Sequence, residues 1–107
     1  MSTKIEFTYE GNEYCLEFTK RTVKIMEDKG FVPSKIMEAP VTNLPELFAG
    51  AFLANHRFVK REVIDKIFDR IKDKAELVST LIEMYSEPIK ALTEDGDEGN
   101  GIEWTKA

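Results

Sequence analysis

Eight consecutive residues without a charged or hydrogen-bonding side chain place the strongest constraint on the fold of this chain. They run from Leu47 to Ala54 within the stretch LPELFAGAFLAN. At about 100° per residue, Leu53 lies on the opposite side of a helix from the apolar face, which comprises Leu44, Leu47, Phe48, Ala51 and Phe52. Gly50 leaves a gap for the close approach of another backbone. We therefore expect a central helix that is contacted on two sides.

The stretch KIEFTYEGNEYCLEF, residues 4–18, predicts a β-hairpin, because apolar and polar residues alternate on both sides of Gly11-Asn12. A type II′ turn at Gly11-Asn12 fixes the predicted register on one apolar face, with the pairs Tyr9–Tyr14, Phe7–Leu16 and Ile5–Phe18. A lone hairpin is marginal in water. Helices must therefore cover this face, or further strands must extend the sheet.

Two predicted helices flank an irregular crossover at residues 31–43. The first spans about residues 20–29 and ends at Gly30, with Phe31 placed for a Schellman contact. The second follows NLPE, where Asn43 is expected to cap the helix, Glu46 to complete a capping box, and Pro45 to lie in the first turn.

Two further helices are predicted at about residues 60–72 and from Asp73 onward. The former is apolar on one side only, through Val63, Ile64, Ile67, Phe68 and Ile71. The latter is expected to be capped by Asp73 with Glu76, and Pro88 is expected to kink or end it. Its wide apolar stripe comprises Leu77, Val78, Leu81, Ile82, Tyr85, Ile89 and Leu92.

The predicted fold class is α+β, in which an N-terminal β-hairpin precedes a compact bundle of about four helices. Residues 1–92 form the expected single globular domain, and residues 93–107 a flexible acidic tail. The tail carries five acidic side chains and one basic one, whereas residues 1–92 carry fourteen basic and fifteen acidic side chains. The body is thus nearly neutral, which argues against nucleic-acid binding by counterion release.

The chain has one cysteine, which excludes an internal disulfide, and no apolar run approaches the ~20 residues of a membrane span. With no leader pattern in MSTKIEFTYE, these features predict a cytoplasmic protein.

Few residues of the chain are candidates for a catalytic or metal-binding site. Cys15 and His56, with Asn55 beside the latter, could be imagined as a cysteine hydrolase site, but no flanking signature supports it, and an ordinary strand residue and a helix-end histidine are the expected roles. Counted from Asp95, the acidic stretch has Asn100 and Lys106 where a calcium-binding loop needs glycine and glutamate. We therefore predict no catalytic, cofactor-binding or metal-binding residue, and no enzymatic activity.

The order of segments resembles one family over nearly the whole chain. A hairpin ends in LEFTKRTVKIMEDKGF and is followed by PVTNLPELFAGAFLANHR, EVIDKIFDRI, ELVSTLIEMYSEPIKAL and an acidic tail with a tryptophan. This order resembles the tail assembly chaperones of long-tailed phages that infect Gram-positive bacteria. The resemblance implies a non-enzymatic protein of the bacterial cytoplasm that coats the tape-measure protein. It also implies displacement of the chaperone as tail tube proteins polymerise.

A long apolar helical client would dock in a groove between amphipathic helices. The residues expected to bind partners are Leu53, Met84, Tyr85, Ile89, Ile102 and Trp104. Trp104 has two expected uses, as part of an edge strand that folds back on the body or as a linear anchor for a partner. A homo-oligomer remains open. The alternative function is an oligomeric adaptor of another phage or mobile-element module, such as a head–tail connector or an antitoxin.

Overall fold

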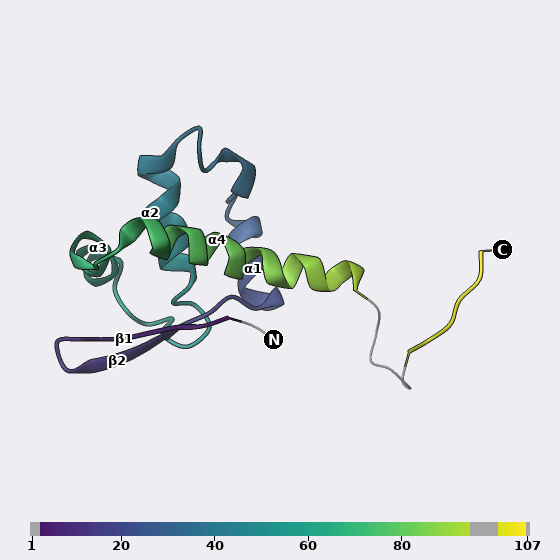
Figure 1. The fold of residues 1–107 in the computed structure, drawn as a ribbon, viewed down its shortest axis with the longest axis horizontal. Coiled ribbons are helices and arrows are strands. Elements are labelled where there is room, and N and C mark those ends of the chain that lie inside the picture. The colour runs from purple at the N-terminus through teal and green to yellow at the C-terminus, as the bar shows by residue number, and fades with distance from the viewer. Residues whose placement is uncertain (1–2, 95–100, 107) are drawn as a thin grey trace.

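The computed structural model describes residues 3–94 and 101–106, and in them a β-hairpin precedes four α-helices (Figure 1). The strands are β1 (Ile5–Tyr9) and β2 (Asn12–Leu16), and they form a two-stranded antiparallel sheet. The helices are α1 (Lys20–Asp28), α2 (Pro40–Gly50), α3 (Arg61–Arg70) and α4 (Lys74–Lys90), with 3₁₀ turns at Pro33–Lys35 and Ala91–Thr93. The predicted α+β class is confirmed. No described helix has the length and apolar character needed to cross a bilayer.

The register of the hairpin differs by two residues from the predicted one. The predicted partners of Tyr9, Phe7 and Ile5 are all wrong, and the observed pairs are Tyr9–Asn12, Phe7–Tyr14 and Ile5–Leu16. A shift of two residues keeps each side chain on its predicted face, because the alternation has a period of two. The apolar face therefore still meets the core.

The turn explains this register. It consists of Glu10 and Gly11, whose φ angles of 49° and 81° are both positive, as a type I′ turn requires. The predicted turn at Gly11-Asn12 is wrong. The observed turn matches the right-handed twist of the strands and needs a positive φ at Glu10, where a side chain costs energy.

The helices cover the apolar face of the hairpin, as expected. Six side chains are the largest that are fully buried, and they come from β2, α2, the turn after α2, and α4: Leu16, Leu47, Phe48, Phe52, Leu81 and Met84. Phe52 meets Phe7 and Tyr14 of the hairpin edge-on, with ring centroids 6.4 and 5.8 Å apart. The core thus lies between the sheet and the helices.

The C-terminal end of α1 forms as the sequence predicts. The backbone N–H of Phe31 donates to the carbonyl of Met26 over 3.0 Å, and that of Gly30 donates to Glu27 over 2.9 Å. With Gly30 at φ 92°, these two bonds form a Schellman motif, which confirms the prediction.

Helix α2 begins one turn earlier than predicted. Its first residue is Pro40, and Pro45 lies inside the helix instead of in its first turn. Asn43 does not cap the helix, because its side-chain amide donates to the carbonyl of Lys35 over 2.9 Å. Glu46 forms an ion pair with Arg61 instead of a capping box. The reason is that Pro40 suits the first helical position as well as Pro45 does.

The boundary between α3 and α4 also differs in detail. Ile64 and Ile67 of α3 are buried as predicted. Asp73 precedes α4 in a left-handed conformation with φ 56° and makes no side-chain capping bond, so the predicted capping box with Glu76 is absent. Helix α4 continues through Pro88 to Lys90, so Pro88 does not end it.

The turn assignment predicts that Glu10→Asn stabilises the protein. Asparagine tolerates a positive φ, so the free energy of unfolding should rise by about 0.5–1 kcal/mol in urea titrations. The matched control is Glu13→Asn, which places asparagine in strand β2 and should give no gain. A loss of stability for Glu10→Asn would contradict the type I′ turn, because Glu10 would then be an extended strand residue.

Candidate functional site

Leu53 lines a cavity in the described structure, but it does not lie on a helix as predicted, because α2 ends at Gly50 and residues 51–55 form turns. The cavity has a volume of about 420 Å³. We call it the α2 groove, and its apolar lining comes from the end of α1, from α2 and from the segment that leads to α3, through Met26, Phe31, Ala49, Gly50, Leu53 and Val59. Leu53 is half-buried and packs against the core. The expectation of one helix contacted on two sides is therefore wrong at Leu53, and the residue lines the groove from the turn after α2.

The rim of the α2 groove carries charges of both signs. Lys29, Glu46, Arg57 and Arg61 line it. The Arg61 guanidinium donates to Glu46 and to Asp65 over 2.9 Å each, and the hydrogen bond to Asp65 is the main reason that the pKa of Arg61 is raised. This ion pair ties α3 to α2 across one end of the groove. An apolar floor with a mixed charged rim suits an amphipathic occupant.

Large apolar side chains are exposed on the segments that flank the α2 groove. Val41 on the first turn of α2 is 89% exposed, next to the groove residues Thr42 and Asn43. Phe58 is 90% exposed, between the groove residues Arg57 and Val59. Exposed apolar side chains that adjoin a cavity mark interaction surfaces more strongly than scattered ones do.

Gly50 does admit a close approach, but the group that approaches is a side chain. A Cβ at Gly50 would collide with Sδ and Cε of Met26, and it would lie 3.3 Å from Cγ of that residue. The expectation of a neighbouring backbone is therefore wrong. The Met26 thioether fills the gap because an unbranched, polarisable side chain adapts to irregular space. This contact forms part of the groove floor.

Two of the six predicted partner-binding residues belong to the core. Met84 is 1% and Tyr85 3% exposed, so neither can contact a client in this structure. At about 100° per residue, both lie close to Leu77 and Leu81, whereas Ile82 and Ile89 lie more than 100° from Leu77 at the other edge of the stripe. Ile82 and Ile89 are exposed and form the apolar edge that α4 offers to solvent, and Leu92 of the following 3₁₀ turn is exposed as well.

Ile102 and Trp104 are 91% and 82% exposed and do not line the α2 groove. They belong to no strand in residues 101–106, so the edge strand considered for Trp104 is absent from this structure. Of the predicted partner-binding residues, only Leu53 lines the α2 groove. Residues 95–100, which hold most of the acidic stretch that is predicted to be flexible, lie outside the described residues.

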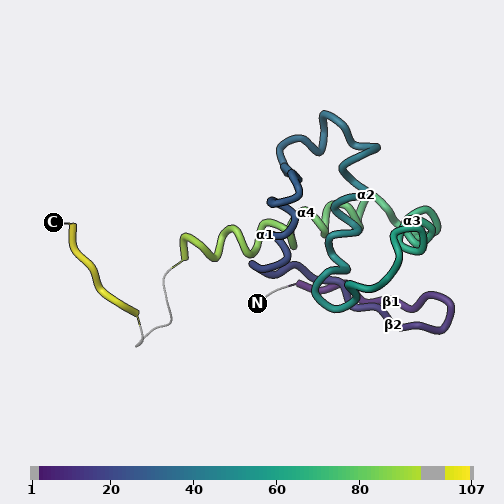
Figure 2. Tube along the Cα trace, turned by 180° about the vertical axis from the view of Figure 1, so that it is seen from behind, coloured from purple at the N-terminus to yellow at the C-terminus, as the bar shows by residue number. Residues whose placement is uncertain are grey.

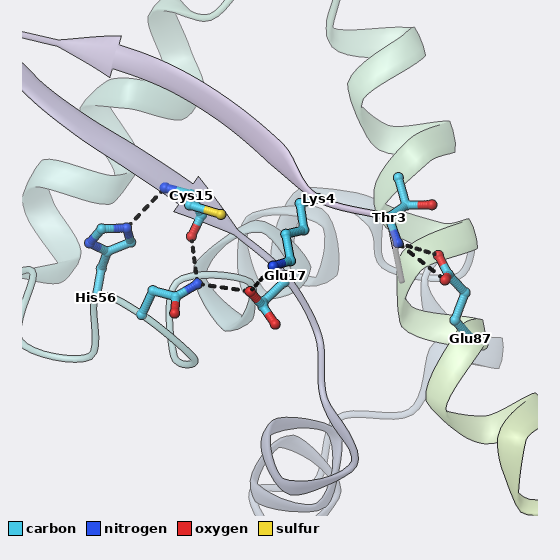
Figure 3. A network of polar contacts seen from close by, with 7 residues as sticks. Thr3, Lys4, Cys15, Glu17, His56 and Glu87 are labelled. Atoms are coloured by element: carbon cyan, nitrogen blue, oxygen red, sulfur yellow. Dashed lines mark hydrogen bonds and ion pairs between the residues drawn. The ribbon is translucent and has the colours of Figure 1, made fainter. Parts of the chain in front are cut away.

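Cys15 and His56 are neighbours, but they are not arranged as a nucleophile and its base. His56 Nε2 accepts the backbone N–H of Cys15 over 2.9 Å, and the thiol points away from the imidazole (Figure 3). Asn55 Nδ2 donates to the Cys15 carbonyl and to Glu17 Oε2, both over 3.1 Å. The two side chains thus bind the outer edge of β2 to the segment after α2. No group of three or more histidine, cysteine or acidic side chains in the described part of the chain could hold a metal ion.

The hydroxyl of Tyr85 is buried in the core without a hydrogen-bond partner among the described residues. Its ring meets Phe18 and Phe31 edge-on, with centroids 5.2 and 5.4 Å apart. Burial, and secondly the charge of Glu27, raise the pKa of Tyr85 above its ordinary value of 10.0. The hydroxyl therefore costs stability without supplying a visible contact.

The environment of Tyr85 predicts that Tyr85→Phe stabilises the fold. Removal of an unpaired buried hydroxyl should raise the free energy of unfolding by about 1 kcal/mol in urea titrations near pH 7. The pKa is raised in the folded state, so the native protein keeps its stability below pH 10.0 and loses it as the pH rises towards the folded pKa. The advantage of the variant should therefore grow above pH 10. Tyr14→Phe is the control, because its hydroxyl is not left buried and unpaired, and an equal gain there would contradict the assignment.

The hydrogen bond that His56 accepts predicts that His56→Ala lowers the stability of the protein. The backbone N–H of Cys15 would lose its acceptor, which should lower the free energy of unfolding by about 1–3 kcal/mol. His56→Gln offers a side-chain carbonyl oxygen and should recover part of the loss, as measured by thermal and urea unfolding. Equal losses for the two variants would show that the ring contacts of His56, and not its acceptor nitrogen, stabilise the fold.

Comparison with known proteins adds a family but no activity. A family model described as Domain of unknown function (DUF5055) matches residues 1–107. No curated protein and no solved structure matches the chain. The function must therefore be argued from the site itself.

Proposed function

The chain belongs to the DUF5055 family, and we propose that it acts as a non-enzymatic tail assembly chaperone that binds an apolar helical segment of a tape-measure protein. The observation that carries this proposal is the α2 groove, a cavity of about 420 Å³ beside Leu53. The order of segments along the chain, which resembles phage tail assembly chaperones, supplies the identity of the client.

The chemistry of the groove favours a helical client. An amphipathic helix anchors in a groove through apolar side chains spaced three or four residues apart, and its polar flanks meet the rim. Leu53 is half-buried and offers an apolar side chain to the groove, and the buried thioether of Met26 packs beneath it on Gly50. The exposed side chains of Val41 and Phe58 extend the apolar surface beyond the cavity.

The charge balance fits a chaperone that must later release its client. The body of the chain, residues 1–92, is nearly neutral, so apolar burial and not charge would hold the client. Assembling tail tube proteins could then displace the chaperone by covering the same apolar stripe of the client. Such a role takes place in the cytoplasm of the bacterial host.

Capture of the client tests this proposal. The tagged protein is co-expressed with the tape-measure protein encoded nearby and recovered by affinity, and the client is quantified by mass spectrometry. Leu53→Asp places a charge in the groove and should reduce recovery by at least about tenfold. Ile82→Asp is the matched control, because Ile82 is an exposed apolar residue on α4 outside the groove, and its recovery should equal that of the native protein.

A second variant protects the test against misfolding, since Leu53 also packs against the core. Phe58→Ser changes a side chain that is 90% exposed and should lower recovery while the thermal unfolding temperature stays unchanged. If the native protein recovers no tape-measure protein, or if Leu53→Asp and Phe58→Ser recover as much as the native protein, the proposed function is wrong.

A further inference from the structure

The two edges of the hairpin are treated differently by the fold. The outer edge of β2 is covered, because His56 and Asn55 bind the N–H and carbonyl of Cys15 and the backbone N–H of Glu17 donates to Ala51 over 3.1 Å. Figure 3 shows His56 beside the Cys15 amide on this strand. Strand β2 therefore has a partner on each side.

The outer edge of β1 has no such cover. Along an antiparallel strand, residues whose backbone is hydrogen-bonded to the partner strand alternate with residues whose backbone points away from it. In the observed register, Glu6 and Thr8 are of the second kind, so their N–H and carbonyl groups point away from β2. No hydrogen bond between described residues reaches the backbone N–H or carbonyl of either residue, and both are exposed. An open edge of this kind is a template for another strand.

A hollow adjoins the open edge on its core side. Its volume is about 270 Å³, and it lies between β1 and the end of α3, lined by Phe7, Thr8, Tyr9, Ile67, Arg70 and Ile71. The guanidinium of Arg70 lies 5.9 Å from the centroid of the Tyr9 ring. The hollow thus offers apolar walls and a cation that is placed for an aromatic ring.

The same chain carries a segment with the matching pattern. In residues 101–106, Ile102 and Trp104 alternate with Glu103 and Thr105, so a strand there would have one apolar and one polar face. Ile102 and Trp104 are 91% and 82% exposed. The chain thus carries both an open strand edge beside a hollow and an exposed segment with the alternation of a strand.

We propose that residues 101–106 of a second copy add to β1 as a third, antiparallel strand. Antiparallel pairing is the more stable kind per residue. The favoured register sets Glu103 opposite Thr8 and Thr105 opposite Glu6, because a shift that sets Glu103 opposite Glu6 brings like charges together. In the favoured register Trp104 lies beside Phe7 over the hollow, within reach of Arg70.

The reach of the chain favours a second copy over the same one. In this register Ile102 enters beside Tyr9, at the turn of the hairpin, whereas the turn and the C-terminal end of α4 lie at opposite ends of the molecule (Figures 1 and 2). Helix α4 has 17 residues and is about 25 Å long. The eight residue steps from Glu94 to Ile102 span at most about 28 Å when fully extended. A contact within one chain would have to cover about the length of α4 with this segment almost fully extended, which favours a second copy as the donor of the strand.

A mutual exchange of residues 101–106 gives a closed dimer. Each copy carries one open edge and one apolar segment, so two copies related by a two-fold axis satisfy both edges and both segments at once. The α2 groove takes no part in this contact. The dimer is therefore independent of the proposed chaperone function, and either can fail without the other.

The only tryptophan of the chain makes the contact measurable. We expect the emission of Trp104 to shift to shorter wavelength as protein concentration rises, in step with a doubling of mass in light scattering. Thr8→Pro removes the outward N–H from β1 and should abolish both changes, whereas Thr8→Val keeps the N–H and should retain them. Trp104→Ala, at a side chain that is 82% exposed, should abolish the doubling of mass without affecting folding.

Three results would overturn the proposal. The first is emission typical of an exposed tryptophan at every concentration. The second is a blue-shifted emission from a protein of monomer mass, which would place the segment on its own chain. The third is a dimer that persists in both Thr8→Pro and Trp104→Ala, because that dimer would use another surface.

Discussion

The packing of Phe52 between the hairpin and the helices is the contact on which the rest of the structure depends. Its ring lies edge-on to Phe7, Tyr14 and Phe48, with centroids 6.4, 5.8 and 5.2 Å away. A two-stranded sheet is not stable alone, and these rings join it to α2. The carbonyl of Ala51 accepts the N–H of Glu17 beside them, so the end of the hairpin is held by the same turn.

The position of Phe52 also determines what remains accessible on α2. Phe52 points into the core from the turn after α2, while Leu53 of the same turn and Ala49 of α2 line the α2 groove beside residues of α1 and of the segment before α3. The apolar run that constrains the fold thus covers the end of α2 and the turn after it, and it supplies both core residues and groove residues. In the proposed chaperone, the core residues provide stability and the groove residues bind the client.

The hairpin shows a similar division. Its β2 edge is bound to the segment after α2 through Asn55 and His56, which gives the lone histidine a structural contact where a catalytic one was considered. Its β1 edge has no such cover, and it binds the second copy in the proposed dimer. One side of the molecule thus offers the open strand edge and another the α2 groove, and a dimer formed through exchanged tails leaves the groove free for a client.

Sequence periodicity by itself determined which side chains face inward. Alternation put Phe7 and Leu16 on the core face of the hairpin, and the helical spacing put Ile64 and Ile67 on the core face of α3. The end of α1 was equally predictable, because a Schellman motif depends on Gly30 and a few neighbouring residues. These features are local, so the sequence near each position contains the necessary information.

Where two arrangements fit the same local sequence pattern, only the tertiary structure decided between them. A two-residue shift preserves the faces of both strands, so alternation could not distinguish the observed hairpin register from the predicted one. The wide apolar stripe of α4 has two edges, and packing against α1 and α2 buried Met84 and Tyr85 while Ile82 and Ile89 stayed exposed. The α2 groove has the same origin. It is walled by α1, α2 and the segment before α3, and their meeting depends on how the whole core packs around Phe52 and not on any one stretch of sequence.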